Sequence, residues 1–183
     1  IRPALKETPL VISIVAGIST PALSQLLSTN CIVRAMPNTP ARIGMGITVW
    51  TCTSQVDEAQ KEITTEVFRS MGEEVFVEDE VYLDMATALS GTGPAYVFLF
   101  MEAMIDAGVH MGFPRRIAER LVLQTIKGSA SFYEGASRHP ATLGNQVTSP
   151  GGTSAEALYY LEKAGFRTAI SRAVWAAYQR SLE

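Results

Sequence analysis

Cysteine, histidine and clustered positive charge are all scarce in this chain. Its 183 residues include two cysteines and two histidines, and 15 lysines and arginines stand against 18 acidic residues. Cys31 and Cys52 lie in apolar, strand-like runs without a CxxC spacing, which predicts buried, reduced thiols and argues against a zinc or other metal site. The basic residues are dispersed, which argues against nucleic-acid binding because that requires a clustered basic surface.

Long hydrophobic runs and a leader-like start are also missing. No uninterrupted apolar stretch approaches the roughly 20 residues of a membrane helix, and the first residues lack a signal-peptide pattern. These absences predict a cytoplasmic protein without membrane contact, unless a segment that precedes Ile1 carries a targeting signal. Hydrophobic residues still make up 47% of the chain and charged residues 18%, so we expect a partner subunit to cover much of the surface.

The first 80 residues alternate between strand-like and helix-like patterns. Continuous β-rich runs are typical of strands buried on both faces of a parallel sheet, and they predict strands at 10–15, 31–36, 46–52 and 74–77. Thr20 before Pro21 predicts the N-cap of a short helix. A second helix is expected at 57–71, with Gly72 as its C-cap glycine. Its predicted apolar face consists of Ala59, Ile63, Val67 and Met71.

After Glu80 only helices are expected. Their predicted ranges are 84–108, 114–133, 153–163 and 166–182. The segment 95–107 is apolar almost all round, which is typical of a helix buried in a bundle or a dimer interface. The sequence therefore predicts a partial, Rossmann-like α/β domain at 1–80, followed by an all-α domain at 81–183, to which the resemblance described below assigns dimerisation and substrate binding.

One expected feature of a dinucleotide-binding fold is absent from the sequence. Such a fold opens with a strand, a glycine-rich turn and a helix, and no segment here has that pattern. The α/β part has the size of half a doubly wound sheet. We therefore interpret it as the second half of such a sheet, with about 80 to 100 residues preceding it in the intact fold.

The strongest local candidate for a binding site is the segment 148–154, with the sequence TSPGGTS. Two glycines before a helix let the backbone turn its N–H groups toward one point, which forms a nest suited to a carboxylate or phosphate. Hydroxyls that are placed to bind the same anion belong to Ser149, Thr153 and Ser154. The alternative is plain helix capping, because Thr153 and Glu156 have the spacing of a capping box.

Two further sets of candidates lie in turns rich in small residues. The segment 90–92 interrupts a helical pattern, which indicates either close approach of a ligand or tight helix packing at a kink. The segments 15–17 and 36–40 each follow a predicted strand. Open α/β sheets bind ligands at the carboxyl ends of their strands, whereas ordinary turns of Pro, Asn and Gly give the same pattern.

No residue stands out as a catalytic acid, base or nucleophile. His110 follows a predicted helix end and His139 precedes a proline, and neither has a carboxylate or nucleophile close by in the sequence. Both are predicted to be surface or capping residues. The catalytic residue is therefore left unassigned.

Five strings, in order, resemble the pyrroline-5-carboxylate reductase family: LVISIVAGIS (10–19), RAMPNTP (34–40), LSGTGPAYVF (89–98), GFPRRIAERL (112–121) and VTSPGGTSAEAL (147–158). They span nearly the whole chain. The resemblance implies an oxidoreductase of proline biosynthesis that transfers a hydride from NADPH or NADH to the C=N bond of 1-pyrroline-5-carboxylate. It also implies a homodimer through the helical domain, and larger rings of such dimers.

The resemblance also implies roles for the candidate segments. The nest would hold the substrate carboxylate and be reached from the partner subunit; its residues are Ser149, Gly151, Gly152, Thr153 and Ser154. The nicotinamide end of the cofactor would be lined by Ala16, Gly17, Pro37 and Asn38. The pocket shared by substrate and nicotinamide would include Ser90, Gly91 and Thr92. Holding the carboxylate orients the imine carbon, and orientation supplies much of the rate in such a reaction, without any metal.

The chain departs from the family pattern at three points. The glycine-rich cofactor turn is absent from the sequence, Ser154 stands where threonine is common, and Thr92 stands where serine is frequent. The last two changes keep the hydroxyl group. Two alternatives therefore stay open: a truncated, inactive homologue that only dimerises, and a related imine or ketone reductase of the same architecture.

Overall fold

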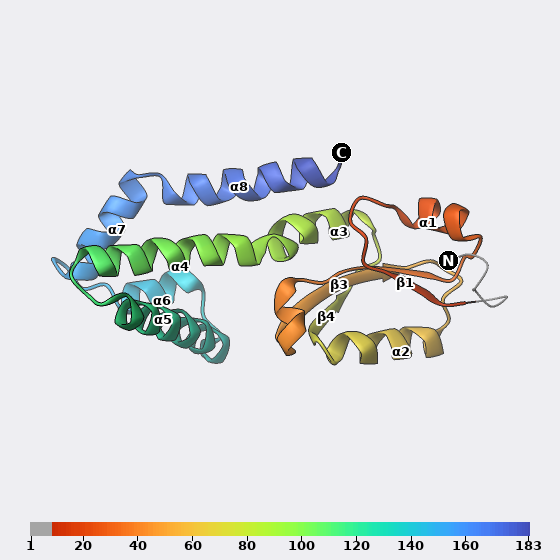
Figure 1. Ribbon diagram of the computed structural model, residues 1–183, viewed down its shortest axis with the longest axis horizontal. Coiled ribbons are helices and arrows are strands. Elements are labelled where there is room, and N and C mark those ends of the chain that lie inside the picture. Colours follow the sequence, from red (N-terminus) through yellow and green to blue (C-terminus); the bar gives the residue numbers. More distant parts are fainter. Residues whose placement is uncertain (1–8) are drawn as a thin grey trace. The chain divides into compact units, whose positions relative to one another are not determined.

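The computed structural model describes residues 9–183, which form a four-stranded sheet followed by a series of helices (Figure 1). The strands are β1 (Val11–Ser13), β2 (Ile32–Met36), β3 (Gly46–Cys52) and β4 (Gly72–Phe76). Between them lie α1 (Thr20–Leu27), the 3-10 turn η2 (Thr39–Ile43) and α2 (Glu58–Arg69). This alternation confirms the α/β class expected from the strand-like and helix-like runs.

The sheet is mixed, whereas the sequence favoured a parallel one. The strands follow the order β1-β2-β3-β4. The pairs β1–β2 and β3–β4 are parallel, but β2 and β3 are antiparallel, with Val33 opposite Cys52. A parallel connection needs a crossover of a dozen or more residues. The short segment 37–45 between β2 and β3 therefore permits only the antiparallel arrangement.

Burial differs sharply between the first two strands. All five residues of β2 are buried. β1 pairs with a single neighbour among the described residues, and it ends at Ser13. Ile14 and Val15 follow it and are 60% and 50% exposed. The prediction of a strand over 10–15 that is buried on both faces is therefore wrong, because no second strand lies beside β1 among residues 9–183.

The core of the α/β part lies between the sheet and α2. Its buried cluster consists of Val33, Ala35, Trp50, Val56 and Phe68. The inward face of α2 carries Thr64 and Phe68, and not the predicted face, since Ile63 and Val67 are 55% and 43% exposed. Thr64 is tolerated inside because its hydroxyl donates to the backbone oxygen of Gln60 at 2.8 Å.

Glycine is required at position 72 for a different structural reason from the one predicted. Gly72 is the first residue of β4 and not the cap of α2, which ends at Arg69 and has Ser70 as its C-cap. Its φ of +137° is a conformation that residues with a Cβ rarely adopt. Gly72 lies opposite Gly46 in the parallel pair β3–β4, and a Cβ added to it would lie 2.1 Å from the backbone oxygen of Gly46.

The start of α1 is shifted by one residue from the prediction. Ser19 is the N-cap, and its Oγ accepts a hydrogen bond from the backbone nitrogen of Ala22 at 3.4 Å. Thr20 is instead the first helical residue and Pro21 the second. The hydroxyl of Thr20 is therefore free of the capping role and binds a carboxylate far away in the sequence, as described below.

From Val81 onward every regular element in the structure is a helix. The elements are α3 (Val81–Ala86), the π-turn η3 (Thr87–Gly91), α4 (Gly93–His110), α5 (Arg115–Ala136), α6 (Pro140–Gln146), α7 (Thr153–Lys163) and α8 (Phe166–Ser181). The short helix α6 was not predicted. His139 is its N-cap, with Nδ1 accepting from the backbone nitrogen of Ala141 at 3.2 Å, which confirms the capping role expected for this histidine.

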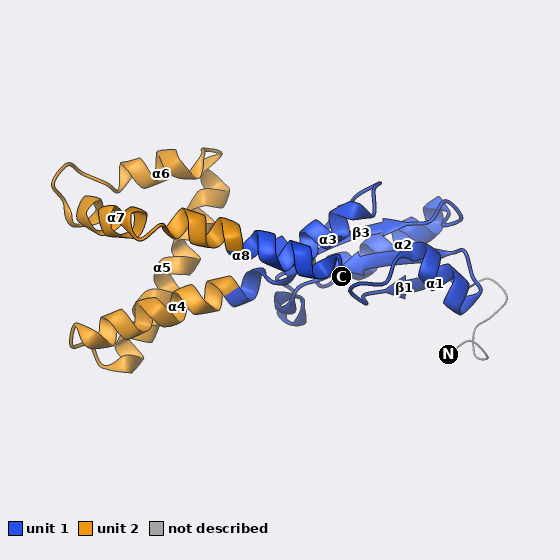
Figure 2. Ribbon diagram, turned by 90° about the horizontal axis from the view of Figure 1, so that it is seen from above, with its two compact units in different colours: residues 1–95, 173–183 blue, residues 96–172 orange. Residues whose placement is uncertain are grey.

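The chain divides into two compact units, coloured separately in Figure 2. One unit comprises residues 1–95 and 173–183, and the other comprises 96–172. The helical region thus begins within the first unit, where α3 and the π-turn belong with the sheet. The domain boundary at 80 and 81 stays a prediction.

The continuous helical segment Val81–His110 is long and apolar enough to cross a membrane, judged by length and composition. The sequence argument missed this because it counted only uninterrupted apolar residues. Phe98 and Leu99 on α4 are 63% and 67% exposed. A helix that a protein partner covers has the same composition, so the property does not by itself indicate a membrane.

Candidate functional site

The π-turn meets the carboxyl end of β2. The backbone nitrogen of Thr92 donates to the oxygen of Thr87 at 2.8 Å, the i to i−5 bond of a π-turn. A Cβ added to Gly91 would lie 3.7 Å from the sulfur of Met36, the last residue of β2. The backbone of Gly91 therefore packs against Met36, the residue that directly precedes Pro37. Single π-turns within helices occur frequently at functional sites.

The hydroxyls of the π-turn are held by backbone carbonyls. Ser90 Oγ donates to the oxygen of Ala86 at 3.0 Å, and Thr92 Oγ1 donates to that of Thr87 at 2.8 Å. Each hydroxyl oxygen still has lone pairs that accept hydrogen bonds. Serine and threonine make the same bonds to the preceding turn in bent helices, so the ligand and kink interpretations of 90–92 both stay predictions.

Two predicted cofactor segments lie at one edge of the sheet. Because β1 and β2 are parallel neighbours, the residues that follow them, Ala16–Gly17 and Pro37–Asn38, emerge at the same edge. Gly17 has a φ of +75°, and a Cβ added to it would meet nothing within 4 Å, so this backbone is open to a ligand. Asn38 has a structural task, since its Oδ1 accepts from the backbone nitrogen of Ile47 at 3.0 Å.

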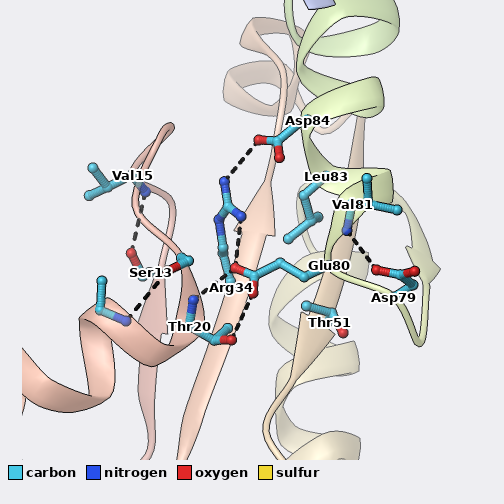
Figure 3. A network of polar contacts seen from close by, with 12 residues as sticks. Ser13, Val15, Thr20, Arg34, Thr51, Asp79, Glu80, Val81, Leu83 and Asp84 are labelled. Carbon is cyan, nitrogen blue, oxygen red and sulfur yellow. Dashed lines mark hydrogen bonds and ion pairs between the residues drawn. The ribbon is translucent and has the colours of Figure 1, made fainter. Parts of the chain in front are cut away.

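A buried arginine beside this edge was missed by the sequence reasoning. Arg34 on β2 is 3% exposed. Its terminal nitrogens contact Glu80 Oε1 at 2.7 Å and Asp84 Oδ1 at 3.2 Å (Figure 3). Glu80 in turn accepts two bonds of 2.8 Å, from the backbone nitrogen and from the hydroxyl of Thr20. One guanidinium thus links β2, α1 and α3.

A sequence signal for this network exists. The run CIVRAM places a charged residue in the middle of an otherwise apolar strand. A charge in such a strand is buried only with a partner, so Arg34 required an acidic partner elsewhere in the chain. Pattern alone does not choose among the 18 acidic residues.

The nest segment forms a tight turn before α7. Gly151 has a φ of +70°, and the backbone nitrogen of Gly152 donates to the oxygen of Ser149 at 3.0 Å. A Cβ added to Gly152 would lie 2.6 Å from Ser149 Oγ, so the hydroxyl lies directly over this glycine. The segment therefore folds tightly, with its serine turned back toward the start of α7.

The capping interpretation of this segment is wrong. The N-cap of α7 is Gly152, and no side chain caps the helix. Thr153 is then the first helical residue, which leaves Glu156 out of register for a capping box. The first N–H groups of an α-helix have no partner within the helix. Those of α7, which include Thr153 and Ser154, thus have no side-chain cap and are suited to an anion.

The candidates fall into both compact units. The nest residues belong to the unit 96–172, and all other candidate residues belong to the unit that contains the sheet.

The two cysteines, Cys31 and Cys52, are free and half-buried. Burial raises the pKa of the Cys52 thiol, which keeps it protonated. Within residues 9–183 no group of three or more His, Cys, Asp and Glu residues is arranged to hold a metal ion.

These features define a class of two-part proteins, in which a partial, Rossmann-like sheet precedes a series of helices. Residues 80–183 match the family described as pyrroline-5-carboxylate reductase dimerisation. The chain belongs to the pyrroline-5-carboxylate reductase family.

Individual relatives agree with this assignment. The pyrroline-5-carboxylate reductase of Synechocystis sp. is 45% identical over 175 residues, which cover 96% of this chain and 65% of that protein. The enzyme of Pisum sativum is 38% identical over 183 residues and is covered to 67%. The chain thus spans about two thirds of the length of these relatives. The crystal structure of the Plasmodium falciparum enzyme, which has NADP bound, matches 94% of this chain and 70% of its own, with 39% identity and a TM-score of 0.89.

Proposed function

We propose that this chain carries out the reduction of 1-pyrroline-5-carboxylate to L-proline with NADPH or NADH, as a homodimer joined through its helical region. The observation that carries the proposal is the uncapped nest before α7, because the substrate of this reaction is a small ring with a single carboxylate. Membership of the family and the relatives' names support the reaction. NADP in the Plasmodium falciparum structure supports the cofactor.

The residues at the sheet edge fit a nicotinamide cofactor. Gly17 leaves the loop after β1 open, and Gly91 brings the backbone of the π-turn against the end of β2. A flat ring that approaches the backbone closely finds open space at Gly17, while the backbone of Gly91 borders Met36 at the same strand end. When bound, the cofactor supplies the hydride. Ser90 and Thr92 contribute acceptor oxygens that orient an N–H group of a bound ring.

The nest contributes position and charge complementarity. The N–H groups at the start of α7 and the positive end of its dipole attract a carboxylate. The hydroxyls of Ser149 and Ser154 are placed to bind the same group. Anchoring the carboxylate fixes the orientation of the imine carbon, and a protonated imine accepts a hydride without a strong acid beside it. Most of the rate enhancement then arises from orientation.

The helical region is proposed to form the homodimer. The family match at 80–183 names dimerisation, and large apolar side chains of this region are exposed in the single chain, among them Phe98, Leu99 and Trp175. Their burial by a second copy removes apolar surface from water, at about 25 cal/mol per Å². Rings of such dimers and a cytosolic location complete the proposal.

The decisive experiment follows the absorbance of NADPH at 340 nm. The purified 183-residue chain is mixed with 1-pyrroline-5-carboxylate and NADPH, and stoichiometric formation of L-proline is expected. A matched assay with a cyclic imine that lacks the carboxylate should show turnover lower by about a hundredfold, because the anchoring contact is lost. Dimerisation in sedimentation without any NADPH consumption would contradict the proposed reaction and favour a chain that only dimerises.

A further inference from the structure

We propose that Arg34 is a positioning residue of this reaction: through Glu80 and Asp84 it holds the loop after β1 and the π-turn against the end of β2. The proposal rests on the proposed function, because these segments are the candidate cofactor edge. Arg34 does not itself contact a candidate ligand position. It acts through the elements that carry Gly17 and Gly91.

The first link runs from Arg34 to α1. Glu80 receives the guanidinium on one oxygen, and the same carboxylate accepts from the backbone nitrogen and the hydroxyl of Thr20. Thr20 is the first residue of α1, three positions after Gly17. Fixing this helix start therefore fixes the far end of the open loop at Ala16–Gly17. The near end of that loop is fixed by the pairing of β1 with β2.

The second link runs from Arg34 to the π-turn. Asp84 accepts from the other terminal nitrogen of Arg34 and lies on α3, whose end passes directly into η3. The side chain of Thr87, the first residue of the turn, donates to the oxygen of Leu83, which is fully buried. The backbone oxygen of Asp84 also accepts from Ser181 Oγ at 3.3 Å. The helix leading into the π-turn is thus held on two sides.

A purely structural role does not account well for this arrangement. A buried ion pair contributes little net stability compared with apolar residues of similar volume. The guanidinium instead has a rigid fork whose two ends point in fixed directions. Here the two ends bind the N-cap residue Glu80 and the first-turn residue Asp84 of α3, and Glu80 in turn binds Thr20 of α1. The buried Nε has no hydrogen-bond partner among the described residues. We infer that the main contribution of Arg34 is the fixed direction of its two contacts, and not stability gained from its burial.

The first test measures local structure and does not depend on turnover. In Arg34→Lys the charge is kept, but a single ammonium cannot reproduce the two directions of the fork. Amide hydrogen exchange in the segments 15–20 and 87–92 is expected to become about tenfold faster, while α2 and β4 keep their protection. Arg34→Met should give a larger effect in the same segments, and if that variant does not fold, Arg34→Lys decides.

Phe68→Leu is the matched control. Phe68 is 1% exposed and packs on Trp50 within the core cluster, away from the Arg34 contacts. This variant should lose stability and speed exchange in α2 and β4, with 15–20 and 87–92 unchanged. Equal acceleration throughout the sheet in Arg34→Lys, or no acceleration in 15–20 and 87–92, would overturn the positioning role.

The second test separates positioning from substrate binding. Arg34→Lys is expected to lower kcat by about ten- to a hundredfold, because misplaced reacting groups lose orientation, and to leave the KM for 1-pyrroline-5-carboxylate within about twofold, since the nest is intact. Phe68→Leu should leave both constants unchanged below its unfolding temperature. A rise in KM with kcat unchanged would also overturn the proposal. If the unaltered chain shows no turnover, the proposed function fails, and the exchange measurement still decides on Arg34.

Discussion

Replacing Gly72 by alanine is expected to unfold the α/β unit at room temperature. The new Cβ would lie 2.1 Å from the backbone oxygen and 2.5 Å from the backbone nitrogen of Gly46, at a φ of +137°. Neither atom belongs to a side chain that can rotate away. Backbone strain and overpacking together should cost about 4 kcal/mol or more, which is a large share of the stability of an ordinary domain.

Tryptophan fluorescence during urea unfolding measures this loss. Trp50 is 2% exposed and lies on β3, the strand that also carries Gly46, whereas Trp175 is 62% exposed. Gly128→Ala is the control, because Gly128 lies within α5 and a Cβ there would meet nothing within 4 Å. That variant should be as stable as the original chain or up to about 1 kcal/mol more stable. An unchanged unfolding midpoint for Gly72→Ala would show that the pairing of β3 with β4 is wrong.

Gly152→Ala is expected to weaken the proposed substrate anchor most strongly. Its Cβ would lie 2.6 Å from Ser149 Oγ and 3.1 Å from the backbone oxygen of Ser149, so the hydroxyl has to leave the nest. The KM for 1-pyrroline-5-carboxylate should rise by about tenfold or more, because a charged substrate loses an oriented hydrogen bond. The KM for NADPH should change by less than about twofold.

Two comparison variants sharpen this experiment. Ser154→Ala removes one hydroxyl and keeps the backbone nest, so its effect on the KM of the imine should have the same direction and a smaller size. Gly135→Ala lies within α5, where a Cβ meets nothing within 4 Å, and it should leave both Michaelis constants unchanged. Equal losses for the imine and for NADPH in Gly152→Ala would count against the carboxylate role.

Local patterns predicted the elements of the fold well, because they are set by short-range physics. The runs around β2 and β3 have the continuous apolar and β-branched content of buried strands, and Pro21 and Pro114 mark helix starts. The helix interruption at 90–92 was also visible, although its form as a π-turn was not. The order of five motif strings then gave the family, which the match at 80–183 confirms.

The remaining features depend on contacts between residues far apart in the sequence. The buried face of α2 was predicted from apolarity alone, but Thr64 is inside because its hydroxyl finds a backbone acceptor. Gly72 stands where a helix cap is expected from the sequence. The structure requires glycine there for another reason, because a Cβ would clash with the backbone of Gly46 on the neighbouring strand. The partners of Arg34 lie 46 and 50 positions away. No periodicity encodes such pairs, so only the folded chain identifies them.

The antiparallel pairing of β2 with β3 has a consequence for the order of folding. These strands are joined by the short segment 37–45, whereas β1–β2 and β3–β4 are each connected through a helix. Closing a short loop has a small entropic cost, and pairings of low contact order form early. We expect β2, η2 and β3 to form the folding nucleus, with the parallel strands on either side added later. Pulse-labelled hydrogen exchange should protect Val33 and Trp50 before Val11 and Val75. The edge that carries the candidate cofactor residues would then be completed last, after its supporting hairpin is already in place.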